Sequence, residues 1–335
     1  MKLQIVVPCF NEEAVLAEAA FQFESIINQL IQAEKISNDS QVTFVDDGSS
    51  DRTWQLIEHE VKTKKHVAGI KLSRNSGHQN AVLAGMMSVD GDAVITIDAD
   101  LQDDLDAIKL MVEEFLAGHE IVYGVRSDRS SDSFFKRTSA IFFYRLLAFF
   151  GVEVVHNHAD YRLMSRRAIN VLQDYKEVNL YLRGIVPLLG FKTTTVEYVR
   201  KERFAGESKY PLSKMIKLAV EGITSFSIVP LQLIFKLGLI LFSGAMALSA
   251  WALFVRLFTD HAVPGWTSTV LPIYLIGGLQ LLSLGVIGEY LGKIYSETKS
   301  RPRYVIERTI DKSSINKSNL PYLHVIENHV IENRV

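Results

Sequence analysis

Acidic and amide side chains are grouped at three places where a run of apolar residues ends. Asn11 and Glu12 follow the run 3–7, Asp46 and Asp47 follow 42–45, and Asp98, Asp100 and Gln102 follow 93–97. Oxygen atoms of this kind are the ligands that Mg²⁺ and Mn²⁺ prefer, and the phosphates of a substrate often fill the remaining positions. The group of Asp98, Asp100 and Gln102 is therefore a candidate site for a divalent metal and a diphosphate.

Asp98 and Asp100 are candidate metal ligands because of their spacing. Residues two apart in an extended segment point to the same face, and Gln102 continues that face with a neutral oxygen. The alternative is that acidic residues after a strand only cap the next helix, as Asp103 or Asp104 would do. Residue types and spacing leave both interpretations open.

The elements that position these side chains are predicted from the hydropathy pattern. Segments of helical periodicity alternate with apolar runs typical of strands, which are 3–7, 42–45, 67–72, 93–97 and 120–124. This alternation predicts an α/β fold with a mostly parallel sheet, in which ligands bind beyond the carboxyl ends of the strands. Neither a GxGxxG fingerprint after the first strand nor a P-loop motif occurs, so the site is expected to be of neither kind.

The composition excludes several other classes of function. The chain has 335 residues, a formal net charge of -2 and a single cysteine, Cys9. A balanced charge gives no reason to expect a nucleic-acid partner. One cysteine excludes an internal disulfide and a cysteine-based zinc site, which fits a reducing compartment.

The apolar excess of the chain lies in its C-terminal third. Residues 237–255 and 262–288 carry no charged side chain, and a helix needs about 20 apolar residues to cross a membrane. We therefore predict a transmembrane hairpin over 230–292, with spans at about 232–256 and 268–290.

Lysine and arginine residues flank this hairpin and are missing from its connecting loop. They are frequent in 192–217 and 293–303, whereas 257–261 contains none. Because basic residues are retained on the cytoplasmic side, both termini are expected in the cytoplasm. The prediction is a two-span protein of the cytoplasmic membrane, with a cytoplasmic domain at 1–225 and a cytoplasmic tail at 293–335.

Four ordered motifs resemble the family 2 glycosyltransferases of GT-A fold: VVPCFNEE (6–13), VDDGSSDRT (45–53), LSRNSGHQNAVLAG (72–85) and IDADLQDD (97–104). The chain looks most like the polyprenyl-phosphate glycosyltransferases, a dolichyl-phosphate mannose synthase-like group, and within it the bacterial bactoprenol glucosyltransferases with two C-terminal membrane helices. The strings 203–215, 226–231 and 288–304 extend the resemblance to about residue 306. It implies a Rossmann-like GT-A catalytic domain followed by the membrane hairpin.

The resemblance also implies roles for the three polar groups. It implies that the nucleoside pocket is formed by Pro8, Asn11, Glu12, Asp46 and Asp47. One of the two aspartates would bind the edge of the uracil ring. Asp98, Asp100 and Gln102 would hold the metal against the donor diphosphate, so Asp98 also belongs to the nucleotide-sugar site. A metal there would stabilise the charge that builds on the leaving nucleoside diphosphate.

Basic residues near the predicted membrane are candidates for binding the donor diphosphate or the lipid phosphate, since arginine forks and lysine charges suit phosphates. The candidates are five basic residues and one serine, namely Arg126, Arg137, Arg200, Arg203, Ser208 and Lys209. For Arg200 the alternative is a topology signal that contacts anionic headgroups. Residues 134–150 and 211–226 are candidate interfacial helices, and for 134–150 a helix buried against the core is the alternative.

Asp160 lies in HADYRLMSRR (158–167), where related transferases carry an acidic residue near the acceptor. An acceptor phosphate is already largely ionised near pH 7 and needs no deep deprotonation. Asp160 is therefore a candidate catalytic base or an organiser of the metal and the acceptor, with a salt bridge to Arg162 or Arg166 as the alternative. His78 lacks metal-site spacing, and a surface or capping role is expected for it.

These expectations combine into one predicted reaction, an inverting and metal-dependent transfer of a sugar to undecaprenyl or another polyprenyl phosphate. UDP-glucose is the first choice of donor and Mg²⁺ or Mn²⁺ the expected cofactor. The product is a lipid-linked monosaccharide for modification of cell-envelope glycans. Membrane lipids are expected partners, and the membrane-bound relatives add a homo-oligomer to the expectations.

Three alternatives to this prediction remain open. The donor can be UDP-N-acetylglucosamine, UDP-galactose, an aminoarabinose derivative or GDP-mannose, because pocket contacts decide among sugars. A processive synthase would share the catalytic domain, but the sequence has no QxxRW-like motif. A membrane-anchored nucleotide-sugar binding protein without catalysis is the third alternative, against which the intact DADLQ segment (98–102) argues.

Overall fold

The computed structural model describes residues 1–127, 158–177, 182–199, 229–258 and 266–312. These residues fall into two compact units. The sheet unit contains the described residues of 1–137, 155–209 and those from 302 onward. The helical unit contains the described residues of 210–301.

The sheet unit is built on an eight-stranded sheet in the order β7-β5-β6-β4-β1-β2-β3-β8. Its strands are β1 (Leu3–Cys9), β2 (Gln41–Asp46), β3 (Val67–Leu72), β4 (Ala93–Thr96), β5 (Ile121–Arg126), β6 (His158–Ser165), β7 (Thr193–Tyr198) and β8 (Ile306–Ile310). Only β6 and β8 of these described strands run against their neighbours. The predicted α/β fold with a mostly parallel sheet is confirmed.

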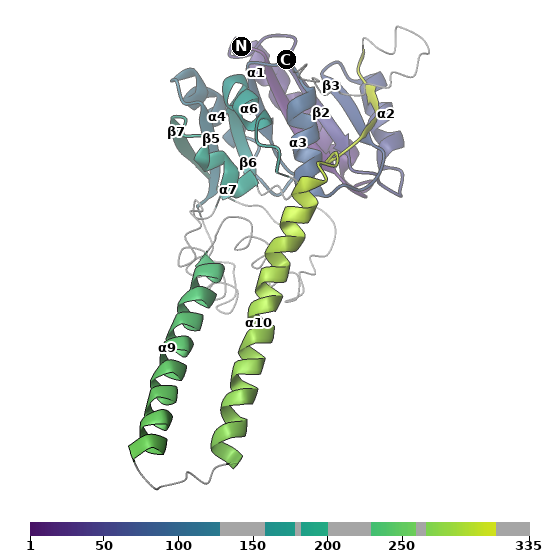
Figure 1. The fold of residues 1–335 in the computed structure, drawn as a ribbon. Coiled ribbons are helices and arrows are strands. Elements are labelled where there is room, and N and C mark those ends of the chain that lie inside the picture. The colour runs from purple at the N-terminus through teal and green to yellow at the C-terminus, as the bar shows by residue number, and fades with distance from the viewer. Residues whose placement is uncertain (128–157, 178–181, 200–228, 259–265, 313–335) are drawn as a thin grey trace, which may run out of the picture. The chain divides into compact units, whose positions relative to one another are not determined.

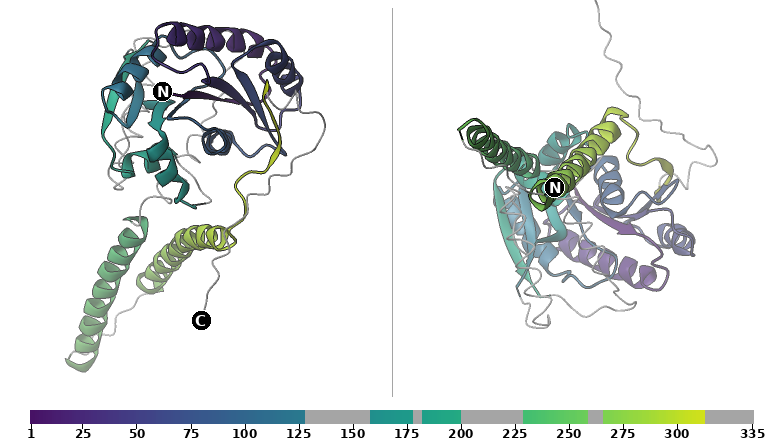
Figure 2. Two further views of the ribbon diagram at one scale, coloured as in Figure 1. Left: turned by 90° about the horizontal axis from the view of Figure 1, so that it is seen from above. Right: turned by 60° about the horizontal axis from the view of Figure 1, so that its bottom comes forward.

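Helices cover both faces of this sheet. They are α1 (Leu16–Gln32), α2 (Thr53–Thr63), α3 (His78–Ser88), α4 (Ala107–Leu116), α6 (Arg166–Gln173) and α7 (Leu182–Leu188). Figure 1 labels the elements, and the left view of Figure 2 shows α1 and α3 on opposite faces of the sheet. Because parallel strands are buried on both faces, their sequences are continuous apolar runs without alternation.

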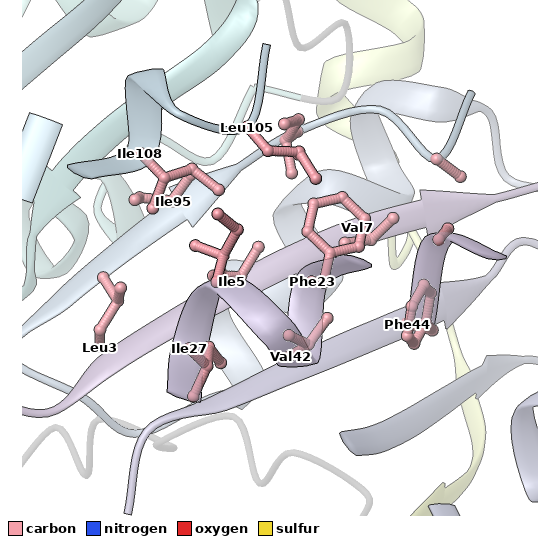
Figure 3. Close-up of a cluster of buried hydrophobic side chains, with 14 of the residues drawn as sticks. Leu3, Ile5, Val7, Phe23, Ile27, Val42, Phe44, Ile95, Leu105 and Ile108 are labelled. Carbon is pink, nitrogen blue, oxygen red and sulfur yellow. The ribbon is translucent and has the colours of Figure 1, made fainter. Parts of the chain in front are cut away.

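The hydrophobic core lies between the central strands and the helices on the α1 face. Leu3, Ile5 and Val7 of β1 point to this face and belong to one cluster with Phe23 of α1, as Figure 3 shows. On the other face α3 approaches β1 closely, since a Cβ atom on Gly85 would lie 2.3 Å from the Val6 side chain. The two faces together hold the central strands, and hence the loops at their carboxyl ends, in fixed positions.

The chain returns to the sheet after the helical unit. Strand β8 pairs antiparallel with β3 at the edge of the sheet, and Ile310 is only 8% exposed there. Gly69 of β3 leaves room for this contact, because a Cβ atom on it would lie 3.0 Å from Ile310 Cγ1. Ion pairs from Lys71 to Glu307 (2.9 Å) and from Arg308 to Glu58 (2.7 Å) flank the strand. Part of the predicted tail 293–335 is thus an edge strand.

The helical unit contains two long helices, α9 (Val229–Phe258) and α10 (Trp266–Thr298), which contact each other. Within the described residues, no helix meets both the length and the apolarity that a membrane crossing requires. The spans at 232–256 and 268–290 therefore stay predictions. The candidate interfacial helices at 134–150 and 211–226 lie outside the described residues.

Candidate active site

The loops after β1 and β2 are joined by hydrogen bonds at the carboxyl edge of the sheet. The N–H of Asn11 donates to Ser49 Oγ (2.9 Å), and Asn11 Oδ1 accepts the N–H of Ser50 (2.9 Å). Asn11 has a φ of 56°, in the left-handed region that asparagine tolerates better than most residues. Asn11 therefore fixes the shape of both loops where the nucleoside pocket is predicted.

Pro8 and Glu12 lie on either side of this junction. Pro8 is buried in β1, in register with Val45 of β2. Glu12 donates its N–H to Thr53 Oγ1 (2.9 Å), and its carbonyl accepts the N–H of Leu16 at the start of α1 (3.1 Å). Glu12 thus joins the predicted pocket to the starts of α1 and α2, whereas Pro8 lies within the sheet beside it.

Asp46 and Asp47 are both buried but differ in their partners. Asp47 Oδ1 and Oδ2 accept the N–H groups of Ser76 (2.7 Å) and Gly77 (3.0 Å). Asp46 Oδ1 accepts the N–H of Ser49 (3.2 Å), whereas Oδ2 is buried and has no hydrogen-bond partner among the described residues. Burial raises the pKa of both carboxyl groups. The two adjacent carboxylates therefore differ: both oxygens of Asp47 are hydrogen-bonded, whereas one buried oxygen of Asp46 lacks a partner, which is energetically costly.

The segment that follows β4 carries the candidate metal ligands, but it is not extended. The chain turns at residues 99–100, and Leu101 has a φ of 56°. The expectation that an extended segment places Asp98, Asp100 and Gln102 on one face is therefore wrong, because the chain has to turn from β4 toward α4. Gln102 is instead buried, and its N–H donates to Asp100 Oδ1 (3.2 Å).

The charges around Asp98 suit a cation. The pKa of Asp98 is raised to about 6: burial makes the largest contribution, His78 opposes it, and the carboxylates of Asp160, Asp103 and Asp100 add to the rise. In the described part of the chain, no group of three or more histidine, cysteine, aspartate or glutamate side chains is arranged to hold a metal ion. Repulsion between oxygen donors is nevertheless what a divalent ion relieves, so the residues present fit Mg²⁺ or Mn²⁺.

Asp160, at the start of β6, is held by three cationic or hydrogen-bonding groups. Arg162 Nη2 donates to Oδ1 (2.9 Å), while Arg183 Nε and Nη2 donate to Oδ1 and Oδ2 (both 3.1 Å). His78 Nε2 lies 3.3 Å from Oδ2. Burial raises the pKa of Asp160, but these partners outweigh it and leave that pKa well below its usual value.

These contacts bear on the two roles that were open for Asp160. A carboxylate with a lowered pKa is a weak base and a well-oriented anion, so the geometry fits an organiser better than a base. Of the two arginines expected to pair with Asp160, Arg162 does so. Arg166 does not, because its guanidinium donates to backbone carbonyls of Met86, Val89 and Gly91.

His78 and Arg183 are site residues that sequence reasoning missed. The ring of His78 is 44% exposed, which agrees with the expected surface position, and its Nε2 also lies 3.7 Å from Asp98 Oδ1. Burial lowers the pKa of His78, but the hydrogen bond with Asp160 and the charge of Asp98 raise it by more. His78 lies in the motif 72–85, which was the available signal, whereas nothing near Arg183 in the sequence marks it.

Arg126, at the end of β5, is linked to the loop that carries the candidate metal ligands. Arg126 Nε donates to Tyr198 Oη (3.4 Å), and Tyr198 Oη donates to Asp103 Oδ1 (2.7 Å). The N-cap position of α4 is Asp106, which makes no side-chain capping bond, and the carbonyl of Asp104 accepts the N–H of Ala107 (3.2 Å). The remaining candidates for phosphate binding lie outside the described residues; they are Arg137, Arg200, Arg203, Ser208 and Lys209.

A structural comparison finds a weak likeness to glucosyl-3-phosphoglycerate synthase from Mycobacterium tuberculosis, crystallised with Mn²⁺, UDP-glucose and phosphoglyceric acid. The TM-score is 0.42 and the identity 18%, over 67% of this chain and 77% of that chain. This TM-score is too low to identify a family, so the family is assigned from the sequence comparisons.

The sequence comparisons agree with the resemblance of the four motifs. The profile of Glycosyl transferase family 2 matches residues 4–172. The Bacillus subtilis glycosyltransferase YkoT is 50% identical over 91% of both chains. The prophage bactoprenol glucosyl transferase homolog of Escherichia coli is 39% identical over 92% of this chain and 99% of its own length. A prophage-derived bactoprenol glucosyl transferase of Shigella flexneri is 38% identical over 92% and 98%. The chain is therefore an enzyme that belongs to glycosyltransferase family 2.

Proposed function

We propose that this enzyme transfers a sugar from a UDP-sugar, with UDP-glucose as the first choice, to the phosphate of undecaprenol or another polyprenol. The observation that carries the proposal is that His78 Nε2 lies 3.7 Å from Asp98 Oδ1 and 3.3 Å from Asp160 Oδ2, which brings the two carboxylates together beyond the carboxyl ends of the parallel strands. Relatives named bactoprenol glucosyl transferase match the chain over nearly its whole length, which supports the lipid acceptor.

The donor side of the site uses residues after β1, β2 and β4. Asp46 or Asp47 accepts the ring N–H of uracil, and Asn11 keeps the surrounding loops in place. Asp98 and Asp100, with Gln102, hold Mg²⁺ or Mn²⁺. When bound, this ion stabilises the negative charge that builds on the leaving UDP.

The acceptor side uses the residues around Asp160. An oxygen of the polyprenyl phosphate attacks C1 of the sugar, and the bond from C1 to the diphosphate oxygen breaks with inversion. Because the phosphate is already ionised near pH 7, this step requires no strong base. Asp160 with its lowered pKa serves as an organiser that fixes His78 and Arg183 next to the reacting groups. Arg126 supplies positive charge for a phosphate at the end of β5.

The proposed location is the cytoplasmic face of the cytoplasmic membrane. It is supported by the uncharged stretches 237–255 and 262–288 and by the basic residues that flank them. A lipid-bound acceptor explains such an anchor, because an enzyme held at the bilayer surface meets the phosphate at high effective concentration. The hairpin over 230–292 is part of this proposal, as is the homo-oligomer.

The test is a reaction of the full-length protein in detergent with undecaprenyl phosphate, Mg²⁺ or Mn²⁺ and a panel of UDP- and GDP-sugars. Mass spectrometry of the lipid fraction should find a hexose adduct from one donor, with a β-linkage when the donor is α-linked. EDTA and the variant Asp98→Ala should remove the product without unfolding the protein. No adduct with any donor, despite measurable binding of UDP, would favour the non-catalytic binding protein.

A further inference from the structure

Two buried tyrosines hold the loop that carries the candidate metal ligands. Tyr198, the last residue of β7, donates its hydroxyl to Asp103 Oδ1 (2.7 Å). Tyr161 of β6 donates its hydroxyl to the carbonyl of Asp104 (3.1 Å). The two rings pack edge to face, with their centroids 5.3 Å apart. The segment directly after Gln102 is therefore fixed by side chains from β6 and β7.

Arg126 lies beside Tyr198 at the ends of two paired strands. The two residues are in register in the parallel pair of β5 and β7. The backbone is held there by Ser127, which donates its N–H (3.0 Å) and its hydroxyl (3.1 Å) to the Tyr198 carbonyl. Arg126 Nε donates to the Tyr198 hydroxyl (3.4 Å), whereas Arg126 Nη2 stays 3.9 Å from Asp103 Oδ1. The hydroxyl of Tyr198 thus joins a cation to a carboxylate that the cation does not itself hydrogen-bond.

The hydroxyl of Tyr198 satisfies a carboxylate that would otherwise attract Arg126. Asp103 is only 4% exposed, and a carboxylate so buried needs hydrogen-bond donors. Burial and the charge of Asp103 raise the pKa of Tyr198, so its hydroxyl keeps its proton at neutral pH and acts as one of these donors. Without the hydroxyl, Arg126 Nη2 would have to move by only about 1 Å to reach hydrogen-bond distance of Asp103.

The guanidinium of Arg126 keeps donors for a further anion. Its hydrogen bond to Tyr198 uses Nε, and neither terminal nitrogen makes a hydrogen bond within the part of the chain that the structure describes. The side chain is 29% exposed, so a ligand can reach it. The planar fork of an arginine suits the oxygens of a phosphate. An arginine drawn onto Asp103 would lose this capacity.

We propose that Tyr198 is a positioning residue whose hydroxyl keeps Arg126 off Asp103 and directs its guanidinium to a phosphate of a substrate. This inference rests on the proposed function, in which Arg126 supplies positive charge for a phosphate at the end of β5. It adds a device that keeps this charge apart from the acidic loop after β4. The phosphate belongs either to the UDP part of the donor or to the lipid acceptor, and separate binding measurements identify which.

The test compares Tyr198→Phe with the wild type in the full-length protein in detergent. Phenylalanine keeps the ring that packs on Tyr161 and removes only the hydroxyl. Calorimetry gives the Kd for UDP, and thermophoresis gives the Kd for undecaprenyl phosphate. We expect one of the two Kd values to rise about 10-fold, the usual effect of weakening a hydrogen bond to a charged group. The ligand whose Kd rises is the source of the phosphate.

Two further backgrounds test whether Tyr198 acts through Arg126. Arg126→Ala leaves no guanidinium to position, and Asp103→Asn leaves no charge to attract it. In either background, Tyr198→Phe should change the affected Kd by less than about twofold. A hydroxyl with a merely structural role would instead give the same loss in every background.

Tyr175→Phe is the matched control. The hydroxyl of Tyr175 makes no hydrogen bond in the described part of the chain, and its residue lies after α6. The variant should match the wild type in both Kd values and in Tm.

Three results would overturn the inference. One is a Tyr198→Phe variant with a native Tm in which both Kd values stay within about twofold of the wild type. Another is an undiminished effect of Tyr198→Phe in the Arg126→Ala background. The third is two unchanged Kd values in Arg126→Ala alone, a result that counts even if Tyr198→Phe does not fold. A wild type that binds both ligands but forms no lipid product is different, since it refutes the proposed function and leaves the binding comparison valid.

Discussion

Asp98 and Asp160 lie on the same edge of the sheet, but their surroundings shift their acidities in opposite directions. Burial raises the pKa of Asp98 to about 6, with further carboxylates adding to the shift. For Asp160, His78 and two arginines lower the pKa well below its usual value in spite of burial. Asp98 is therefore a side chain whose charge a cation would stabilise, whereas Asp160 stays ionised without one.

The raised pKa of Asp98 predicts how the stability of the metal-free protein depends on pH. Its folded-state pKa lies above the unfolded value of 3.8, so the folded form binds the proton more tightly. The resulting stabilisation is present below the unfolded value and is lost as the pH rises through about 6. We expect the Tm of the wild type in EDTA to fall relative to that of Asp98→Asn between pH 5 and pH 8. Parallel Tm curves for the two proteins would contradict the shifted pKa.

Asp160→Asn is predicted to lower turnover with little change in the Kd for the donor. The variant keeps the shape of the side chain but leaves Arg162, which is 1% exposed, without its charged partner. Removing one partner of a buried pair typically costs about 3 to 5 kcal/mol, so the Tm should also fall. Turnover and UDP binding measured on the same preparation separate the two effects. Unchanged turnover would remove Asp160 from the site.

Among the elements, β8 is placed in the sheet by contacts with residues that are far away in the sequence. A sheet edge exposes unpaired backbone groups, and a strand that covers it prevents pairing with other chains. Here β8 covers β3, and Ile310 contacts Gly69 in the space that the missing side chain leaves. The strand is held by apolar burial at one end and by the ion pairs of Glu307 and Arg308 along its length.

Ile310→Ala is predicted to destabilise the sheet unit by about 2 to 5 kcal/mol, the usual cost of truncating a buried isoleucine. Thermal unfolding of the full-length protein should show a lower Tm. Val305→Ala is the matched control, because Val305 is 52% exposed and precedes the strand. Its effect should stay within about 0.5 kcal/mol. Equal Tm values for the two variants would argue that β8 does not contribute to the stability of the sheet.

At the scale of the whole molecule, the sheet unit and the helical unit carry different chemistry. Carboxylates, arginines and a histidine gather in the sheet unit, whereas α9 and α10 are mainly apolar. This division matches an enzyme whose donor is soluble and whose acceptor is a lipid. A membrane hairpin and a homo-oligomer stay predictions at this scale.

The topology prediction is tested by proteolysis of the protein in sealed inside-out vesicles, where the cytoplasmic side faces the protease. Residues beyond 293 and the domain 1–225 should both be digested, because the flanking basic residues keep both ends in the cytoplasm. Right-side-out vesicles are the control and should protect both ends. Protection of the tail in inside-out vesicles would contradict the two-span hairpin.

Local sequence patterns determined much of this protein. Apolar runs predicted the central strands, and the acidic residues after them lie, as expected, at the carboxyl ends of those strands. The motifs also sufficed to identify the family, since their residue types and order are specific. These features were predictable because strand formation and motif identity depend on residues that are close in sequence.

Only the tertiary structure decided which side chains meet. It separated Asp46 from Asp47, replaced Arg166 by Arg183 as a partner of Asp160, and brought His78 into the site. It also turned the segment 98–102 out of an extended conformation and placed β8 on the edge of β3. Each of these contacts joins elements distant in sequence or depends on a turn that packing imposes, and periodicity reports only local geometry. The contacts follow from sheet order and strand register, which the folded chain sets as a whole.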